Sequence, residues 1–201
     1  MNAIEINKLI VQLVGELIDK PLSSGEIEYS PETYRFVLEE LRKNFLCINN
    51  KTLESMLRAN AKMLMVICYE IIQTTALEKK INDMVKNHTI EKQRDLPKSQ
   101  SQTNGAYEVK AFELSKTMAN TISKLLGLPV GEKLENLYRP EIHEPKIEEL
   151  KKNLEHMKEK ERNWITNSAF MLLLICDVFL NALRDERPNL MDVLESRFHS
   201  Y

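Results

Sequence analysis

The chain repeats itself at a spacing of about 108 residues, and this repeat constrains the fold more than any other feature. NAIEINKLIVQLVGELIDKP at 2–21 returns as KAFELSKTMANTISKLLGLP at 110–129, with Ala, Glu, Lys, Leu and Pro at matching places. LEELRKNF at 38–45 matches IEELKKNL at 147–154, and MLMVIC at 63–68 matches MLLLIC at 171–176. Three collinear blocks in almost one register indicate a tandem duplication. The alternative is that helical sequences with a similar amphipathic composition match by chance.

The repeat predicts two homologous units of three to four helices, at 1–85 and 108–201. Residues 86–107 between them are polar and contain Pro97, Gly105 and a Ser/Gln tract, a composition that is typical of a flexible linker. Repeated helical units cover apolar faces that a single copy leaves bare. We therefore expect the two units to pack as a pseudo-twofold helical bundle.

Composition predicts an all-α protein, because only five of the 201 residues are glycine and aromatic residues make up 6% of the chain. Apolar residues from Ile4 to Ile18 recur at three- and four-residue steps, which is the period of one helix face, and Pro21 follows. In the second copy, Gly127 and Pro129 end the corresponding helix. We expect the helix after that to begin with a proline in its first turn, near Pro31 in copy one.

The third helix of each unit is apolar almost all round, so we expect these two helices to form the shared core. In copy one it spans residues 51 to about 80, with Asn49 or Asn50 as its cap. In copy two no Gly, Pro or Asn pair interrupts LEHMKEKERNW at 154–164. That segment predicts one continuous helix over about 145–187.

Charge and apolar patterning argue against several classes of function. The formal net charge is −2, so the chain as a whole lacks the positive field that favours nucleic-acid binding. The most apolar run, AFMLLLICDVFL at 169–180, is shorter than a membrane span, and the N-terminus does not resemble a signal peptide. We expect an intracellular protein, cytoplasmic or nuclear, with Cys47, Cys68 and Cys176 as buried free thiols.

No nucleotide-binding, zinc-protease or hydrolase motif is present in the sequence, and we expect no cofactor. The weak alternative is a metal or carboxylate–histidine site at Glu141, His143 and Glu144. A second alternative uses the repeated paired glutamates, which are Glu39, Glu40, Glu148 and Glu149. Both alternatives describe a helical-bundle enzyme or a small-molecule or metal binder with carboxylates at the repeat interface. Surface charge pairs on ordinary helices explain the same residues.

The leading hypothesis is a non-catalytic interaction or scaffold protein, a subunit of a larger assembly that binds a protein partner through a groove or an apolar helix face. Trp164, the single tryptophan, begins the most apolar helix and is either a core anchor or a partner contact. A last short helix after Pro188 has an apolar side. The candidate partner-binding residues are Trp164, Leu190, Val193, Leu194 and Phe198.

Overall fold

The computed structural model describes residues 1–22, 37–42, 48, 50–76, 105–129 and 138–182, and all regular secondary structure in these ranges is helical. The helices are α1 (Ala3–Leu17), α3 (Lys51–Thr75), α5 (Gly105–Leu126), α6 (Pro140–Leu154) and α7 (Glu159–Ala182), and residues 37–42 form a further short helical segment. The all-α prediction is confirmed. Helix α5 begins inside the segment that we expected to be linker, and residues 86–104 of that segment lie outside the described ranges.

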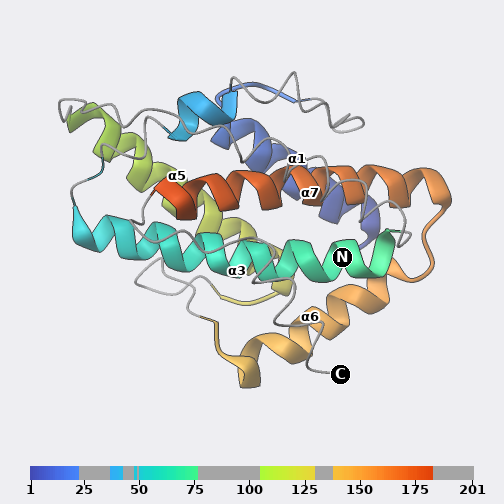
Figure 1. The fold of residues 1–201 in the computed structure, drawn as a ribbon. Coiled ribbons are helices and arrows are strands. Elements are labelled where there is room, and N and C mark those ends of the chain that lie inside the picture. The colour runs from blue at the N-terminus through green and yellow to red at the C-terminus, as the bar shows by residue number, and fades with distance from the viewer. Residues whose placement is uncertain (23–36, 43–47, 49, 77–104, 130–137, 183–201) are drawn as a thin grey trace.

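The centre of the bundle is the pair α3 and α7, which run side by side in opposite directions (Figure 1). α1 packs against α7, α5 packs against α3, and α1 and α5 also touch each other. α6 lies at the edge of the bundle against α3 and α5. One continuous apolar core joins all five helices. Its fully buried members include Ile10, Leu64, Met118 and Leu172.

Within the described part of the chain, α7 is the one helix that is long and apolar enough to cross a membrane by length and composition. Its apolar window is 83% buried inside the bundle. This burial is what the central helix of a packed bundle shows, and it agrees with the core position that the sequence predicts for this segment.

α1 and α5 end in the same way. The backbone N–H of Lys20 donates to the carbonyl of Gly15, and that of Leu128 donates to Ser123, both at 2.9 Å. Asp19 and Gly127 adopt positive φ angles of 57° and 62° at the turn between these partners. This is the Schellman helix end, and it lies 108 residues apart in the two helices. The sequence predicted both ends, at Pro21 and at Gly127 with Pro129.

α3 begins directly after Asn50, whose side-chain oxygen accepts hydrogen bonds from the backbone N–H groups of Thr52 and Leu53. Asn50 is one of the two N-cap residues, Asn49 or Asn50, that the sequence predicts. The first helix is capped in a similar way, because Asn2 and Glu5 form a reciprocal capping box at the start of α1.

The prediction of one continuous helix over about 145–187 is wrong. α6 ends at Leu154, and α7 begins at Glu159. Met157 is buried in the core between them, and the backbone N–H of Lys158 donates to the carboxylate of Glu161 at 3.2 Å. A glutamate in the first turn thus starts α7 without a Gly, Pro or Asn residue. α7 begins 108 residues after α3 begins at Lys51, so both helices start at matching positions of the sequence repeat.

Candidate functional site

In the described part of the chain, five large hydrophobic side chains are exposed, and four of them form two matching pairs. Met1, which lies before α1, is 42% exposed, and Ile4, in the first turn of α1, is 50% exposed. On α5, Val109 is 67% exposed and Phe112 is 43% exposed. Each residue of the first pair lies 108 positions before its counterpart in the second pair. We call Met1/Ile4 the first apolar pair and Val109/Phe112 the second apolar pair. The fifth exposed side chain, Ile142, belongs to α6.

The same charged residues follow each apolar pair. Glu5 and Lys8 come one and four positions after Ile4, and Glu113 and Lys116 come one and four positions after Phe112. All four side chains are exposed. Lys8 lies one turn after Ile4 and Glu5 in α1, and Lys116 lies one turn after Phe112 and Glu113 in α5, whereas Met1 lies before α1 begins at Ala3. Each pair therefore belongs to a short surface with two apolar positions, a carboxylate and an ammonium group in the same order.

The two apolar pairs lie at opposite ends of α1. The first pair is at its N-terminus, and the second is beside its C-terminus, because Lys110 of α5 forms an ion pair with Asp19 at 2.9 Å. The 15 residues between Ile4 and Asp19 span roughly 22 Å of helix. α1 and α5 run in opposite directions along this contact (Figure 1).

Sequence reasoning did not find these surfaces. It matched Ile4 with Phe112 in the repeat but placed Ile4 on the buried stripe of its helix. The buried face of α1 instead begins at Ile6 and continues through Ile10 and Val14. The position of Ile4 in the sequence is the observation that argues against its burial. It lies two residues before the buried face begins, and residues two apart lie on different sides of a helix.

A shallow groove of about 490 Å³ runs beside the second half of α1. Its walls are the exposed side of α1 around Gln12 and Glu16 and the chain from Asp19 to Leu22, which folds back over Gly15. The walls mix charged, polar and apolar groups.

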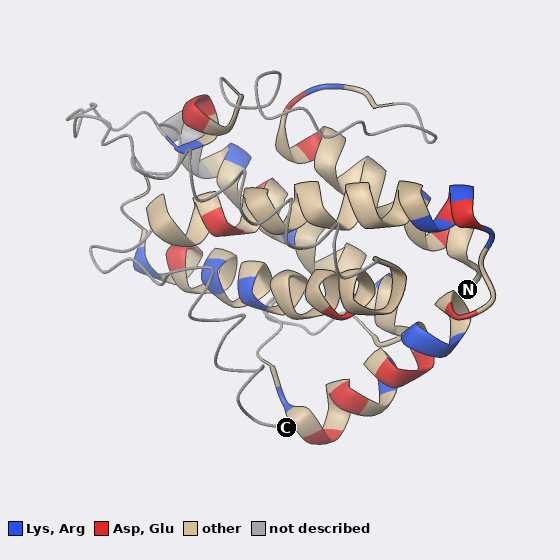
Figure 2. Ribbon diagram, turned by 45° about the vertical axis from the view of Figure 1, so that its right-hand side comes forward, with Lys and Arg blue, Asp and Glu red and all other residues tan. Residues whose placement is uncertain are grey.

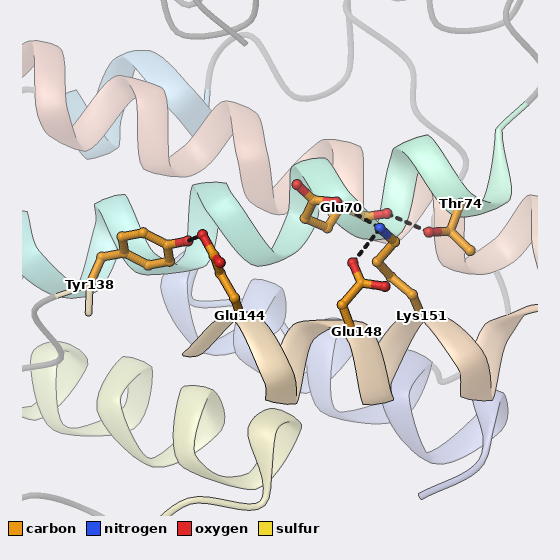
Figure 3. A network of polar contacts seen from close by, with 6 residues as sticks. All are labelled: Glu70, Thr74, Tyr138, Glu144, Glu148 and Lys151. Atoms are coloured by element: carbon orange, nitrogen blue, oxygen red, sulfur yellow. Dashed lines mark hydrogen bonds and ion pairs between the residues drawn. The ribbon is translucent and has the colours of Figure 1, made fainter. Parts of the chain in front are cut away.

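The residues of the weaker metal prediction lie at the start of α6. His143 is buried, and its Nδ1 accepts a hydrogen bond from the backbone N–H of Arg139 at 2.8 Å. The imidazole stacks on Tyr138, with ring centroids 5.8 Å apart, and the Tyr138 hydroxyl donates to Glu144 at 3.1 Å (Figure 3). His143 therefore satisfies the backbone N–H of Arg139, the N-cap residue of α6, whose own side chain makes no capping hydrogen bond. Glu141 is exposed.

The paired glutamates of copy two are engaged with lysines. Glu149 is 2.9 Å from Lys146, and this hydrogen bond lowers the pKa of the Glu149 carboxyl. Glu148 is 2.7 Å from Lys151, which also reaches Glu70 of α3 at 3.5 Å (Figure 3). The hydrogen bond to Glu148 raises the pKa of Lys151, with Glu70 adding to the effect. The ion pair between Lys151 and Glu70 ties the edge helix α6 to α3.

In copy one, Glu40 is exposed and Glu39 is half-buried. Among the residues that the structure describes, no three His, Cys, Asp or Glu side chains gather to hold a metal ion. Charged residues line the outer side of α6 and the helix ends, whereas the middle turns of the central helices carry few of them (Figure 2).

Cys68 and Cys176 are fully buried free thiols, as the sequence predicted, and Cys47 lies outside the described residues. They occupy matching places in α3 and α7. Burial raises the pKa of both thiols, and the electrostatic influence of Cys68 and Asp177 raises that of Cys176 further. A thiol with a raised pKa is a poor nucleophile, so we assign these two buried cysteines a packing role in the core.

Trp164, the first of the candidate partner-binding residues, is half-buried near the start of α7, and the ammonium group of Lys160 lies 4.7 Å from the centroid of its ring. The other four candidates, Leu190, Val193, Leu194 and Phe198, lie outside the described residues. Comparisons of the chain with models of protein families, with curated proteins and with solved structures found no match.

Proposed function

We propose that this chain is a non-catalytic interaction protein, built from two tandem copies of one helical unit, which binds a protein partner through the exposed helix faces that carry the two apolar pairs. The observation that carries this proposal is the recurrence of exposed apolar side chains at matching positions, Ile4 with Phe112 and Met1 with Val109. An apolar side chain that is about half exposed contributes less to the core of its own unit than a buried one does. Its recurrence on both helices favours a use outside the chain.

The duplication is supported by burial as well as by sequence. Ile10 and Val14 of α1 are fully buried, and so are their counterparts Met118 and Ile122 of α5. The packing is also reciprocal, because the first helix of each unit packs against the third helix of the other. A pseudo-twofold axis between α3 and α7 accounts for both features.

The main alternative is a carboxylate-based enzyme or a small-molecule or metal binder at the repeat interface. That function needs carboxylates that face one another across a cleft. Glu148 and Glu149 instead pair with lysines, and His143 uses its Nδ1 to hold the start of α6. These contacts give the alternative less support than the apolar pairs give to partner binding. We also propose residence in the cytoplasm or nucleus, which the buried free thiols Cys68 and Cys176 support.

Affinity capture from a lysate of the native host tests this function when it is run with matched variants. We expect the full-length protein to retain a partner in a fixed ratio, and the double variant Ile4→Glu with Phe112→Glu to lose it while remaining folded. The control is Ile142→Glu, which places the same charge at an exposed apolar position of α6, outside both apolar pairs. Equal retention by the double variant and the control would refute the proposed surface.

A second variant addresses the C-terminal candidates. Leu194→Glu places a charge among the apolar residues that the sequence assigns to the last helix. If the folded Leu194→Glu variant alone loses the partner, the contact lies at that segment. The α1 and α5 surfaces would then not be the binding site.

A further inference from the structure

We propose that the two halves of this chain are obligate binding partners of each other, and that the complementary half of a second copy of the chain fits the same surface. The first half contains α1 and α3, and the second half contains α5, α6 and α7. The surface consists of the buried faces on which the helices of the two halves meet. It is distinct from the exposed apolar pairs, which concern a partner outside the chain.

The described helices of the first half pack on the second half and not on each other. α1 packs against α7 and α5, and α3 packs against α7, α5 and α6. No comparable packing joins α1 to α3, or α7 to α5 or α6, in the described part of the chain. Figure 1 shows α3 and α7 side by side through the middle of the bundle. The described helices of neither half therefore enclose a core of their own.

Each half covers the apolar faces of the other. Ile10 and Val14 of α1 and Leu64 and Ile67 of α3 are fully buried, and the helices that α1 and α3 pack on belong to the second half. Leu172 of α7 is also fully buried, and α7 packs on α1 and α3. Separation of the halves would expose these faces to water, which disfavours the folding of either half alone.

Buried hydrogen bonds also join the halves. The side-chain amide of Asn60 in α3 donates to the backbone oxygen and the hydroxyl of Ser115 in α5, each at 3.1 Å. The hydroxyls of Thr75 in α3 and Thr166 in α7 are 2.8 Å apart. Both contacts lie inside the core and pair one half with the other. Directional contacts of this kind specify how the halves align, which apolar burial alone does not.

The same contacts favour the complementary half over a second copy of the same half. If the halves are copies of one unit, as proposed above, Asn7 aligns with Ser115 and Ser168 aligns with Asn60. Two first halves would then bring Asn60 to Asn7, and two second halves would bring Ser168 to Ser115. The first pairing would be overpacked and the second would leave a gap, whereas the complementary pairing sets a large residue against a small one.

Cutting the full-length chain between its halves tests the proposal. A recognition sequence for a site-specific protease is inserted between Ser99 and Gln100, outside the described helices, and the purified protein is cleaved. The two fragments should co-elute at the position of the uncut protein, in equal amounts and with unchanged circular dichroism. In urea, the unfolding midpoint of the cut protein should rise with protein concentration, whereas that of the uncut protein should not. Fragments that separate, folded or unfolded, would overturn the proposal.

The hydrogen bonds between the halves are tested in the cut protein. Asn60→Ala should raise the dissociation constant of the fragments about thirtyfold, the factor that corresponds to about 2 kcal/mol. Ser115→Ala should add little once Asn60→Ala is present, because both substitutions act on the same contact. The control is Thr74→Val, which should have a much smaller effect because the Thr74 hydroxyl donates within its own helix to the backbone oxygen of Glu70. Fully additive effects of Asn60→Ala and Ser115→Ala would overturn the register on which the complementary fit depends.

The fit of a second copy is tested by refolding. Isotope-labelled and unlabelled cut proteins are unfolded, mixed, refolded together and weighed by native mass spectrometry. Complexes should form that contain a first half from one preparation and a second half from the other. Complexes of two first halves or two second halves in equal number would overturn the complementary fit, and the absence of mixed complexes would overturn binding between separate chains. These outcomes are independent of whether the exposed apolar pairs bind a partner.

Discussion

Asn60 joins α3 to α5, because its side-chain amide donates to both the backbone oxygen and the hydroxyl of Ser115, each at 3.1 Å. In the sequence repeat, Ser168 aligns with Asn60 and Asn7 aligns with Ser115, so α3 and α1 carry asparagine where α7 and α5 carry serine. Asn7 is also buried, but among the residues that the structure describes its Oδ1 has no hydrogen-bond partner. Two buried asparagines in one bundle thus differ in whether their side chains are satisfied.

This difference predicts opposite effects of the same substitution. Asn60→Leu leaves the buried Ser115 hydroxyl without its donor and should lower the free energy of unfolding by about 2–3 kcal/mol. Asn7→Leu removes an unsatisfied buried oxygen and should leave the free energy of unfolding unchanged or raise it. Urea denaturation of both variants measures the contrast. Equal losses would show that the two asparagines have equivalent roles.

Gly15 should not tolerate a side chain although it lies inside a helix. A Cβ atom at this position would be 2.7 Å from the backbone oxygen of Lys20, which belongs to the turn that ends α1. Gly15→Ala should therefore destabilise the protein by about 1–3 kcal/mol, although the same change in an open helix stabilises by up to about 1 kcal/mol.

Gly127→Ala is the matched comparison for Gly15→Ala. A Cβ atom there meets nothing within 4 Å, so its cost comes from the φ angle of 62° alone and should be about 1–2 kcal/mol. Thermal unfolding of both variants is the measurement. A Gly15→Ala protein that is more stable than the parent would contradict the close approach of Lys20 to α1.

The buried thiols should make the protein less stable at alkaline pH. Burial raises the pKa of Cys68 and Cys176 in the folded protein, whereas thiols of the unfolded chain have the ordinary cysteine pKa of about 8.5. Above pH 9 the unfolded state therefore binds fewer protons than the folded state, and stability falls as pH rises. Each thiol contributes a slope of up to about 1.4 kcal/mol per pH unit.

Urea denaturation between pH 8 and pH 10.5, in a Cys47→Ser background, measures this slope. The variants Cys68→Ala and Cys176→Ala should each remove about half of it, whatever their effect on stability at pH 8. The two thiols should also fail to react with a disulfide reagent until the chain is unfolded. Fast modification of the folded protein would contradict the buried positions of both cysteines.

Strong local signals in the sequence predicted the helix ends and the central helices correctly. A proline after an amphipathic stripe ended α1, a glycine at positive φ ended α5, and Asn50 capped α3. The break between α6 and α7 was missed because its signals are not local breakers. Met157 enters the core, and Glu161 reaches back to the backbone of Lys158, which a helix-forming sequence does not reveal.

The candidate surface was missed for a different reason. Periodicity identifies apolar residues that share a helix face, but it does not say which neighbouring helix covers that face or how far the cover extends. Ile4 lies in the first turn of α1, before the buried stretch that begins at Ile6. The two-residue step from Ile4 to Ile6 places Ile4 on another side of the helix, but whether a neighbouring helix covers that side depends on the packing of α5 and α7.

The central claim is that Ile4 and Phe112 serve binding and not folding, and the free energy of unfolding of the isolated protein tests it most directly. Ile4→Ser and Phe112→Ser should each lower that free energy by only about 1 kcal/mol, because about half of each side chain is exposed. Met118→Ser, at a fully buried position of α5, should cost several times more and serves as the internal standard. Losses of about 2–4 kcal/mol at positions 4 and 112 would show that these side chains belong to the core, and would contradict the account.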